Sequence, residues 1–302
     1  MGLNKRLIGA GAAGGSFVNS ENFKAVTYTG NGGTQAITGV GFQPDFVWIK
    51  CRSTSHSHFA ADSTRGANKY VMPNETSAEL TRSDQIQSFD TDGFTLAGNG
   101  DVNGSGKTYV AWCWKSGGGT TSSNTDGSIT STVQANTDAG FSIVKYDGGN
   151  ISGSTTTVGH GLSAAPELII VKTYETGLSP SEWFVYSQEV GNTKEGNLNK
   201  STAFGTDTDR WNSTSPTSSV FTLGSSWSDY PGYYAGDTIA YCFHPVDGFS
   251  KFGSYTGNSS DNGPIVETGF EPAFLMIKNS SDAGSWFMYD NKRNTSNPRI
   301  NY

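Results

Sequence analysis

The chain has 302 residues, of which 16% are charged, and its formal net charge is −7. This acidic balance and the scattered basic residues argue against a nucleic-acid-binding protein, and no apolar run reaches the roughly 20 residues that span a bilayer. The 39 glycines, interrupted by short runs of Val, Ile, Phe, Trp and Tyr, predict an all-β protein.

The first 20 residues form a glycine- and alanine-rich arm that contains Lys5, Arg6, Leu7 and Ile8. Its apolar content is too short and too glycine-rich for a secretory signal, so we expect a protein made and folded in a reducing cytosol. Residues 9–14 match the pattern G-x-G-x-x-G, but glycine and serine follow where a dinucleotide site requires a helix. We therefore predict no nucleotide cofactor.

A first repeat spans residues 21–115. Its short apolar segments alternate with turn formers, which predicts an antiparallel β-sandwich of Greek-key or jelly-roll type. Residues 47–49 and 109–114 are continuous apolar runs, so we expect central strands with both faces covered, one of them by a neighbouring repeat or chain. The predicted strands centre on Val26, Ala36, Val47, Phe59, Val71, Phe94 and Ala111.

Residues 116–135 separate this repeat from the next one. They begin with a run of serine, glycine and threonine, which is typical of a flexible linker. We therefore expect the two repeats to be joined loosely here.

The same strand signature occurs three times, at residues 42–50, 162–172 and 270–278. Each copy has a proline, a polar or small residue, an apolar run and then a lysine. A spacing of this length predicts tandem sandwich domains, the second over 136–247 and the third over 248–302. The third repeat has the opening strands, of which 252–258 is the loosest copy. It lacks the Phe-Thr-Leu strand found at 94–96 and 221–223, and it lacks the closing strand found at 110–114 and 239–243. Because a half-sandwich exposes edges and an apolar face, we expect more polypeptide, or another chain, to complete it.

The three cysteines have no spacing suited to zinc. Cys113 and Cys242 occupy equivalent places in the closing strands, which predicts small apolar core residues. Cys51 follows a strand end, and Thr173 and Asn279 take its place in the other repeats. We expect Cys51 to be dispensable and exposed.

Several motifs carry alternative interpretations. Residues 101–108 resemble a phosphate loop, but a strand follows where a helix is required. Residues 90–93 could be part of a calcium loop, although Asp-Gly more simply predicts a turn. His56 and His58 with Asp62 could bind a metal, or lie in a solvated loop. We expect no metal, no cofactor and no catalytic residue.

The loop before the second closing strand is a candidate binding site. Exposed aromatic rings beside a carboxylate suit sugar recognition, but such rings also mark protein interfaces, and both interpretations remain open. The equivalent loop of the first repeat has no aromatic residue, so the fold does not require them there. The candidate residues are Trp227, Asp229, Tyr230, Tyr233 and Tyr234.

Four segments together resemble a repeat domain of unknown function found in bacteriophage virion proteins, many of them from marine phages. That domain is similar in outline to concanavalin-like and laminin-G-like sandwiches. The resemblance is strong over the first repeat and weaker over the other two, since the second repeat lacks the Asp-Ser-x-Arg-Gly and Asp-x-Asp-Gly-Phe elements. The segments that carry it are residues 41–50, 62–66, 89–96 and 109–115.

The resemblance implies a non-enzymatic virion structural protein, assembled in the host cytoplasm, and most simply a tail fibre that mediates host attachment. Lys5, Arg6, Leu7 and Ile8 would then attach the arm to another tail or capsid protein, unless residues 1–20 are only a disordered tail. Fibres of this kind are homotrimers, and a host-surface glycan is a further expected partner. The alternatives are a capsid decoration protein, a carbohydrate-binding module array and, last, a depolymerase.

Overall fold

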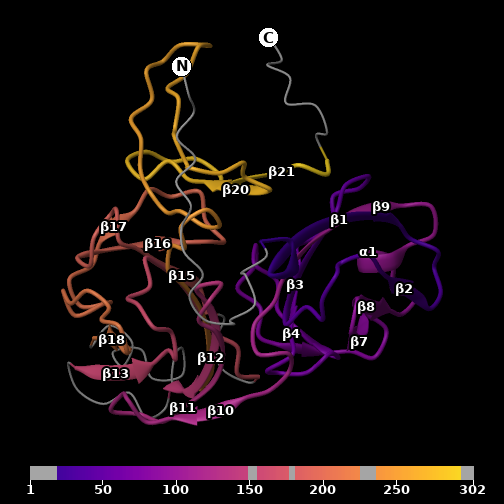
Figure 1. The fold of residues 1–302 in the computed structure, drawn as a ribbon, viewed down its shortest axis with the longest axis horizontal. Helices are drawn as coiled ribbons and strands as arrows, with labels where there is room; N and C mark the ends of the chain where they lie inside the picture. The colour runs from indigo at the N-terminus through magenta and orange to yellow at the C-terminus, as the bar shows by residue number, and fades with distance from the viewer. Residues whose placement is uncertain (1–18, 149–154, 177–180, 225–235, 294–302) are drawn as a thin grey trace, which may run out of the picture.

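Antiparallel strands make up almost all of the regular structure of the chain in the computed structural model (Figure 1). The structure describes residues 19–148, 155–176, 181–224 and 236–293. The predicted all-β class with antiparallel sheets is confirmed. Two short helices occur in these residues, η1 (Asn19–Glu21) and α1 (Gly100–Asn103), and no helix in them is long and apolar enough to cross a membrane.

Two sheets enclose the core of the first repeat. The larger sheet has the order β1-β9-β3-β4, and the smaller has the order β2-β8-β7. Alternation along the strands turns one face of each sheet inward, where Phe94 and Tyr109 are fully buried. The bounds are β1 (Phe23–Thr29), β2 (Gln35–Ile37), β3 (Phe46–Cys51), β4 (Phe59–Asp62), β7 (Ile86–Asp90), β8 (Gly93–Leu96) and β9 (Thr108–Trp114).

Six of the seven predicted strand centres of this repeat lie inside observed strands. Val71 lies just past β5 (Lys69–Tyr70) and bridges Ala60 instead. The strands β6 (Leu80–Thr81) and β7 were not predicted, because their residues are mostly polar and carry no apolar run.

An eight-stranded sheet dominates the second repeat, in the order β10-β11-β12-β19-β14-β15-β16-β17. The pair β13-β18 covers one face of it and encloses a second core, in which Phe221 and Leu223 are fully buried. The bounds are β10 (Ser122–Asn124), β11 (Ser131–Asn136), β12 (Phe141–Asp147), β13 (Thr156–Gly159), β14 (Leu168–Thr173), β15 (Trp183–Ser187), β16 (Lys194–Asn197), β17 (Gly205–Thr206), β18 (Val220–Leu223) and β19 (Asp237–Phe243).

The strand order β12-β19-β14-β15 repeats the order β1-β9-β3-β4, and the registers agree as well. Cys113 pairs with Val47, and Cys242 pairs with Ile169 in the equivalent place. Both cysteines are fully buried, as predicted. The sequence repeat is therefore also a repeat of strand pairing.

The segment predicted as a flexible linker is ordered by hydrogen bonds, so that prediction was wrong. The Asp45 carboxylate accepts backbone N–H bonds from Ser116 at 2.6 Å, Gly118 at 2.9 Å and Gly119 at 2.8 Å. The positive φ angles of the two glycines, 64° and 81°, turn these groups toward one carboxylate. The following residues form two further strands of the large sheet, β10 (Ser122–Asn124) and β11 (Ser131–Asn136).

The third repeat contributes a two-stranded sheet, β20 (Phe274–Ile277) with β21 (Phe287–Asp290). Residues 252–258, predicted as its opening strand, form no strand. In the other repeats the opening strand pairs with β9 or β19, which in turn pairs with β3 or β14. No equivalent of β9 or β19 lies beside β20 in the part of the chain that the structure describes.

The outward faces of all three repeats meet in one shared core. Trp112 from the first repeat and Ile143 from the second are buried in this single apolar cluster, and the partly buried Phe274 from the third packs against it. The expectation that a covered outer face packs on a neighbouring repeat is confirmed. The division at 1–20, 21–115, 116–135, 136–247 and 248–302 into separate domains stays a prediction, since this core runs across three of those ranges.

Candidate functional site

The two groups of residues that we predicted as binding sites lie outside the described residues. They are the aromatic loop with Trp227, Asp229, Tyr230, Tyr233 and Tyr234, and the arm with Lys5, Arg6, Leu7 and Ile8. Several buried charged residues, among them Asp62, Arg65, Lys172 and Asp290, instead lie at the junctions between the repeats.

The first junction is built around Asp62 and Arg65 at the end of β4. The Arg65 Nε donates to Asp62 Oδ2 at 2.6 Å, and its Nη1 donates to Glu79 Oε2 at 3.1 Å. The Tyr241 hydroxyl, from β19 of the second repeat, donates to the same Asp62 oxygen at 2.8 Å. The Asp62 and Arg65 side chains are 0% and 1% exposed, so this ion pair is fully enclosed.

The electrostatics of this junction keep the arginine charged. Burial lowers the pKa of Arg65, but the neighbouring Asp62, Tyr241 and Glu79 more than offset it, and the net pKa is raised. Burial first, and then the charge of Asp62, raise the pKa of Tyr241 well above its ordinary value. Tyr241 therefore stays a neutral donor.

The second junction repeats this design between the third repeat and the first. The Arg293 Nε donates to Asp290 Oδ2 at 2.5 Å, and Trp112 Nε1 donates to the same oxygen at 3.1 Å. The Arg293 guanidinium also lies 5.1 Å from the centre of the Trp112 ring. Trp112 and Tyr241 occupy the same place in β9 and β19.

The sequence analysis missed the Asp290–Arg293 pair. A signal for it was present, because Asp62 and Arg65 have the same spacing and Asp290 pairs with Phe274 in the same way as Asp62 pairs with Phe46. Burial raises the pKa of the Asp290 carboxyl, but hydrogen bonds from Arg293 outweigh this, and the net pKa is lowered. Asp290 thus carries its charge in the folded protein.

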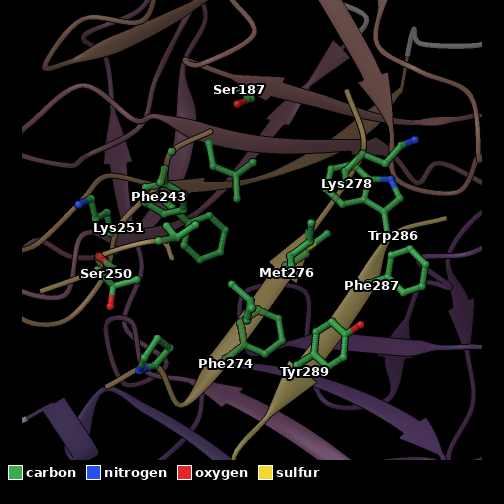
Figure 2. Close-up of a pocket in the computed structure, with 18 of the residues that line it drawn as sticks. Ser187, Phe243, Ser250, Lys251, Phe274, Met276, Lys278, Trp286, Phe287 and Tyr289 are labelled. Carbon is green, nitrogen blue, oxygen red and sulfur yellow. The ribbon is translucent and has the colours of Figure 1, made fainter. Parts of the chain in front are cut away.

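The third junction has no such ion pair. In the second repeat Ser187 stands opposite Leu168, which is the place of Asp62 opposite Phe46, and Val190 stands in the place of Arg65. Ser187 and Val190 line a large cleft. Figure 2 shows Ser187 at its edge. The contact between the second and third repeats therefore lacks the buried ion pair that the other two junctions have.

Tryptophan and lysine side chains form further hydrogen bonds between the first and second repeats and between the second and third. Trp183 and Trp286 donate from Nε1 to the carbonyl oxygens of Met72 at 3.0 Å and Asn197 at 2.9 Å. Each of these bonds joins one repeat to the repeat before it. The motif lysines do the same, since Lys172 donates to Thr76 O at 2.9 Å and Lys278 to Ser201 O at 3.3 Å.

The junctions follow one cyclic order. The first repeat reaches the second through Asp62, the second is bonded to the third through Trp286, and the third reaches the first through Asp290. Figure 1 shows β20 and β21 above the sheets that contain β12 and β1, with the three parts around a common centre.

The cleft lies between the third repeat and the other two, and its volume is about 1410 Å³. Figure 2 shows Phe274 and Met276 of β20 on one side of it and Phe243 on another. Phe23 and Leu168 also belong to its mainly apolar lining. A surface of this kind suits an apolar polypeptide partner better than a small charged ligand.

This chain belongs to the DUF7483 family. The family model, described as a domain of unknown function, matches residues 18–302. No curated protein and no solved structure matches the chain. The DUF7483 match thus covers all three repeats, and its description assigns no activity or partner.

The histidines predicted as a metal pair or a solvated loop have separate partners. His56 Nδ1 lies 2.9 Å from Asp101 Oδ1, whereas His58 Nδ1 accepts from Trp48 Nε1 at 2.9 Å. Burial, followed by the charges of Lys50 and Arg293, lowers the pKa of His58 to about 4. In the described part of the chain, no group of three or more His, Cys, Asp or Glu side chains is placed to hold a metal ion.

Two further sequence interpretations are settled by local geometry. Residues 90–93 form the turn of the β7–β8 hairpin, and the Asp92 carboxylate accepts the N–H groups of Gly39 and Gly41. Cys51 is 3% exposed, so the expectation of an exposed thiol was wrong. It is the last residue of β3 and pairs with Tyr109 of the central strand, which encloses it.

Proposed function

We propose that this chain is a structural protein of a bacteriophage virion, namely a tail fibre that attaches through its N-terminal arm and takes part in host recognition. The phage assignment is supported by the resemblance carried by residues 41–50, 62–66, 89–96 and 109–115. The structural role is supported by the shared core, which is the observation that carries the proposal.

The charged side chains at the junctions serve to hold the repeats together. Asp62 and Arg65 satisfy one another and Tyr241, and Asp290 and Arg293 do the same with Trp112. Removing one partner of a buried ion pair is strongly destabilising, because the other charge stays buried and uncompensated. Such junctions suit a rigid building block, which is what a fibre or an adhesin needs.

The expected homotrimer needs a surface other than the outward sheet faces. We expected a neighbouring repeat or a sister chain to cover those faces, and within this single chain Trp112 and Ile143 are buried in one cluster against which Phe274 packs. Self-association therefore remains part of the proposal, with contacts elsewhere on the chain.

The proposal is tested on virions produced by the genome that encodes this chain. Antibodies raised against the purified protein should label the tail when virions are viewed by immunoelectron microscopy, and virions whose copy lacks residues 1–20 should lose the label. Label over the capsid would favour the decoration protein instead. An unlabelled virion, with the protein absent from its mass spectrum, would overturn the virion assignment.

A further inference from the structure

The third repeat exposes an apolar face that the other repeats bury. Leu275, Phe287 and Tyr289 are 43%, 54% and 47% exposed. Their equivalents by strand register in the second repeat are Ile169, Phe184 and Tyr186, which are at most 2% exposed. The second and third repeats thus have apolar residues at the same three positions, which are buried in the second repeat and exposed in the third.

The cover in the first two repeats is a strand of the smaller sheet. Phe221 of β18 lies in the same buried core as Ile169 and Phe184. Phe94 of β8 has the same role over Val47 in the first core. No strand of this type covers β20 among the residues that the structure describes.

The edge of β20 is also unpaired within the described residues. Its equivalents β3 and β14 each lie between two strands, with β9 and β19 on the side that β20 leaves open. An exposed strand edge presents unpaired N–H and C=O groups and is a template for strand addition. The open edge and the exposed face therefore call for two consecutive strands.

The cleft at the third junction supplies the remaining space. Trp112 on the central strand β9 donates to Asp290 on β21, and Tyr241 on the central strand β19 donates to Asp62 on β4. Each bond thus joins the central strand of one repeat to the strand of another repeat that corresponds to β4. At the third junction Leu168, Ser187 and Val190 line the cleft, and the central strand that would face them is the one that no described residues supply beside β20. This part of the cleft is continuous with the shared core.

We propose that the third repeat binds a β-segment with the chemistry of Gly93–Trp114. Its first strand would place a phenylalanine over Leu275 and Phe287, as Phe94 and Phe221 do in the other repeats. Its second strand would pair antiparallel with β20 and place an aromatic residue against Leu168 and Val190. Because Ser187 and Val190 replace an ion pair there, this aromatic residue needs no hydrogen-bonding group.

The inference rests on the repeat geometry and not on the virion assignment. It is tested with the full chain and a synthetic peptide of residues 93–114, read out by hydrogen exchange with mass spectrometry. We expect the peptide to slow amide exchange over residues 274–290 at least tenfold. The matched control peptide carries Val110→Pro. Val110 pairs with Lys50 in the same hydrogen-bonding phase as Thr108 with Arg52, so this change removes an N–H group that faces the pairing strand and should give no protection.

A pair of chain variants locates the site. Leu275→Asp should abolish the protection, and Leu80→Asp should keep it, since Leu80 is similarly exposed at 39% but lies on β6. Both variants alter exposed side chains, and their circular dichroism should match that of the unchanged protein. The inference is overturned if the peptide gives no protection, if it protects only the first repeat, or if Leu275→Asp leaves the protection intact.

Discussion

The Tyr241 hydroxyl donates a hydrogen bond of 2.8 Å to Asp62, although the two residues are 179 positions apart. The bond joins the central strand of the second repeat to the edge strand of the first. The same contact recurs between Trp112 and Asp290 at 3.1 Å, so the repeats are joined by a repeated junction as well as by similar folds.

Replacing Asp62 should destabilise the whole chain. Asp62→Asn leaves the Arg65 guanidinium buried without its main counter-charge, which we expect to lower the free energy of unfolding by about 3–5 kcal/mol. Urea denaturation measures this change. The control is Asp84→Asn, since Asp84 and Arg82 are 45% and 48% exposed and an ion pair this exposed contributes little to stability. Equal effects of the two substitutions would contradict the role of the junction.

Removing only the bridging hydroxyl should have a smaller effect. Tyr241→Phe keeps the buried ring and the Asp62–Arg65 pair but deletes one charge-assisted hydrogen bond, which we expect to cost about 2 kcal/mol of unfolding free energy. The double variant with Asp62→Asn should lose less than the sum of the two single effects, because the residues share one interaction. Strictly additive losses in urea denaturation would argue that they act independently.

The protein should lose stability as the pH falls from 6.5 to about 4. The pKa of His58 is lowered to about 4, so the unfolded chain binds a proton there in that window and the folded chain does not. Stability from this group is complete above pH 6.5 and falls by up to about 3 kcal/mol at pH 4. His58→Gln keeps an acceptor for Trp48, and its urea midpoint should change less between pH 7 and pH 4.5. If His58→Gln showed the same pH dependence as the unchanged protein, His58 would not be the group that causes the loss of stability.

The segment after the first repeat should resist proteolysis. The N–H groups of Ser116, Gly118 and Gly119 are bonded to Asp45, which leaves this glycine-rich stretch ordered. We expect a protease of broad specificity to spare residues 116–121 in the native protein and to cut them in Asp45→Ala. Rapid cutting of the unchanged protein at this point would restore the flexible-linker interpretation.

The strands that could be predicted are those with repeated apolar runs, such as β3, β14 and β20, because apolar residues on both faces of a strand leave a clear signal in the sequence. The short strands β6 and β7 could not be predicted, since their residues are polar and tertiary pairing decides their conformation. The ordering of residues 116–119 was missed for a related reason. A glycine-rich run looks the same whether its N–H groups meet water or the distant Asp45.

The junctions were only partly visible in the sequence. Covered outer faces on the central strands predicted contact with another repeat or chain, and the shared core confirms a contact between repeats. Which residues would meet could not be predicted, because Asp62 and Tyr241 come together only when two sheets pack. The pair Asp290–Arg293 was within reach, since its spacing copies that of Asp62 and Arg65.

The central claim is that the three repeats fold as one unit around a shared core, and native-state hydrogen exchange of Asp62→Asn tests it most directly. The account predicts that amide protection falls by the same free energy in β9 of the first repeat and in β19 of the second. A fall confined to the first repeat, with β19 keeping its original protection, would contradict the claim.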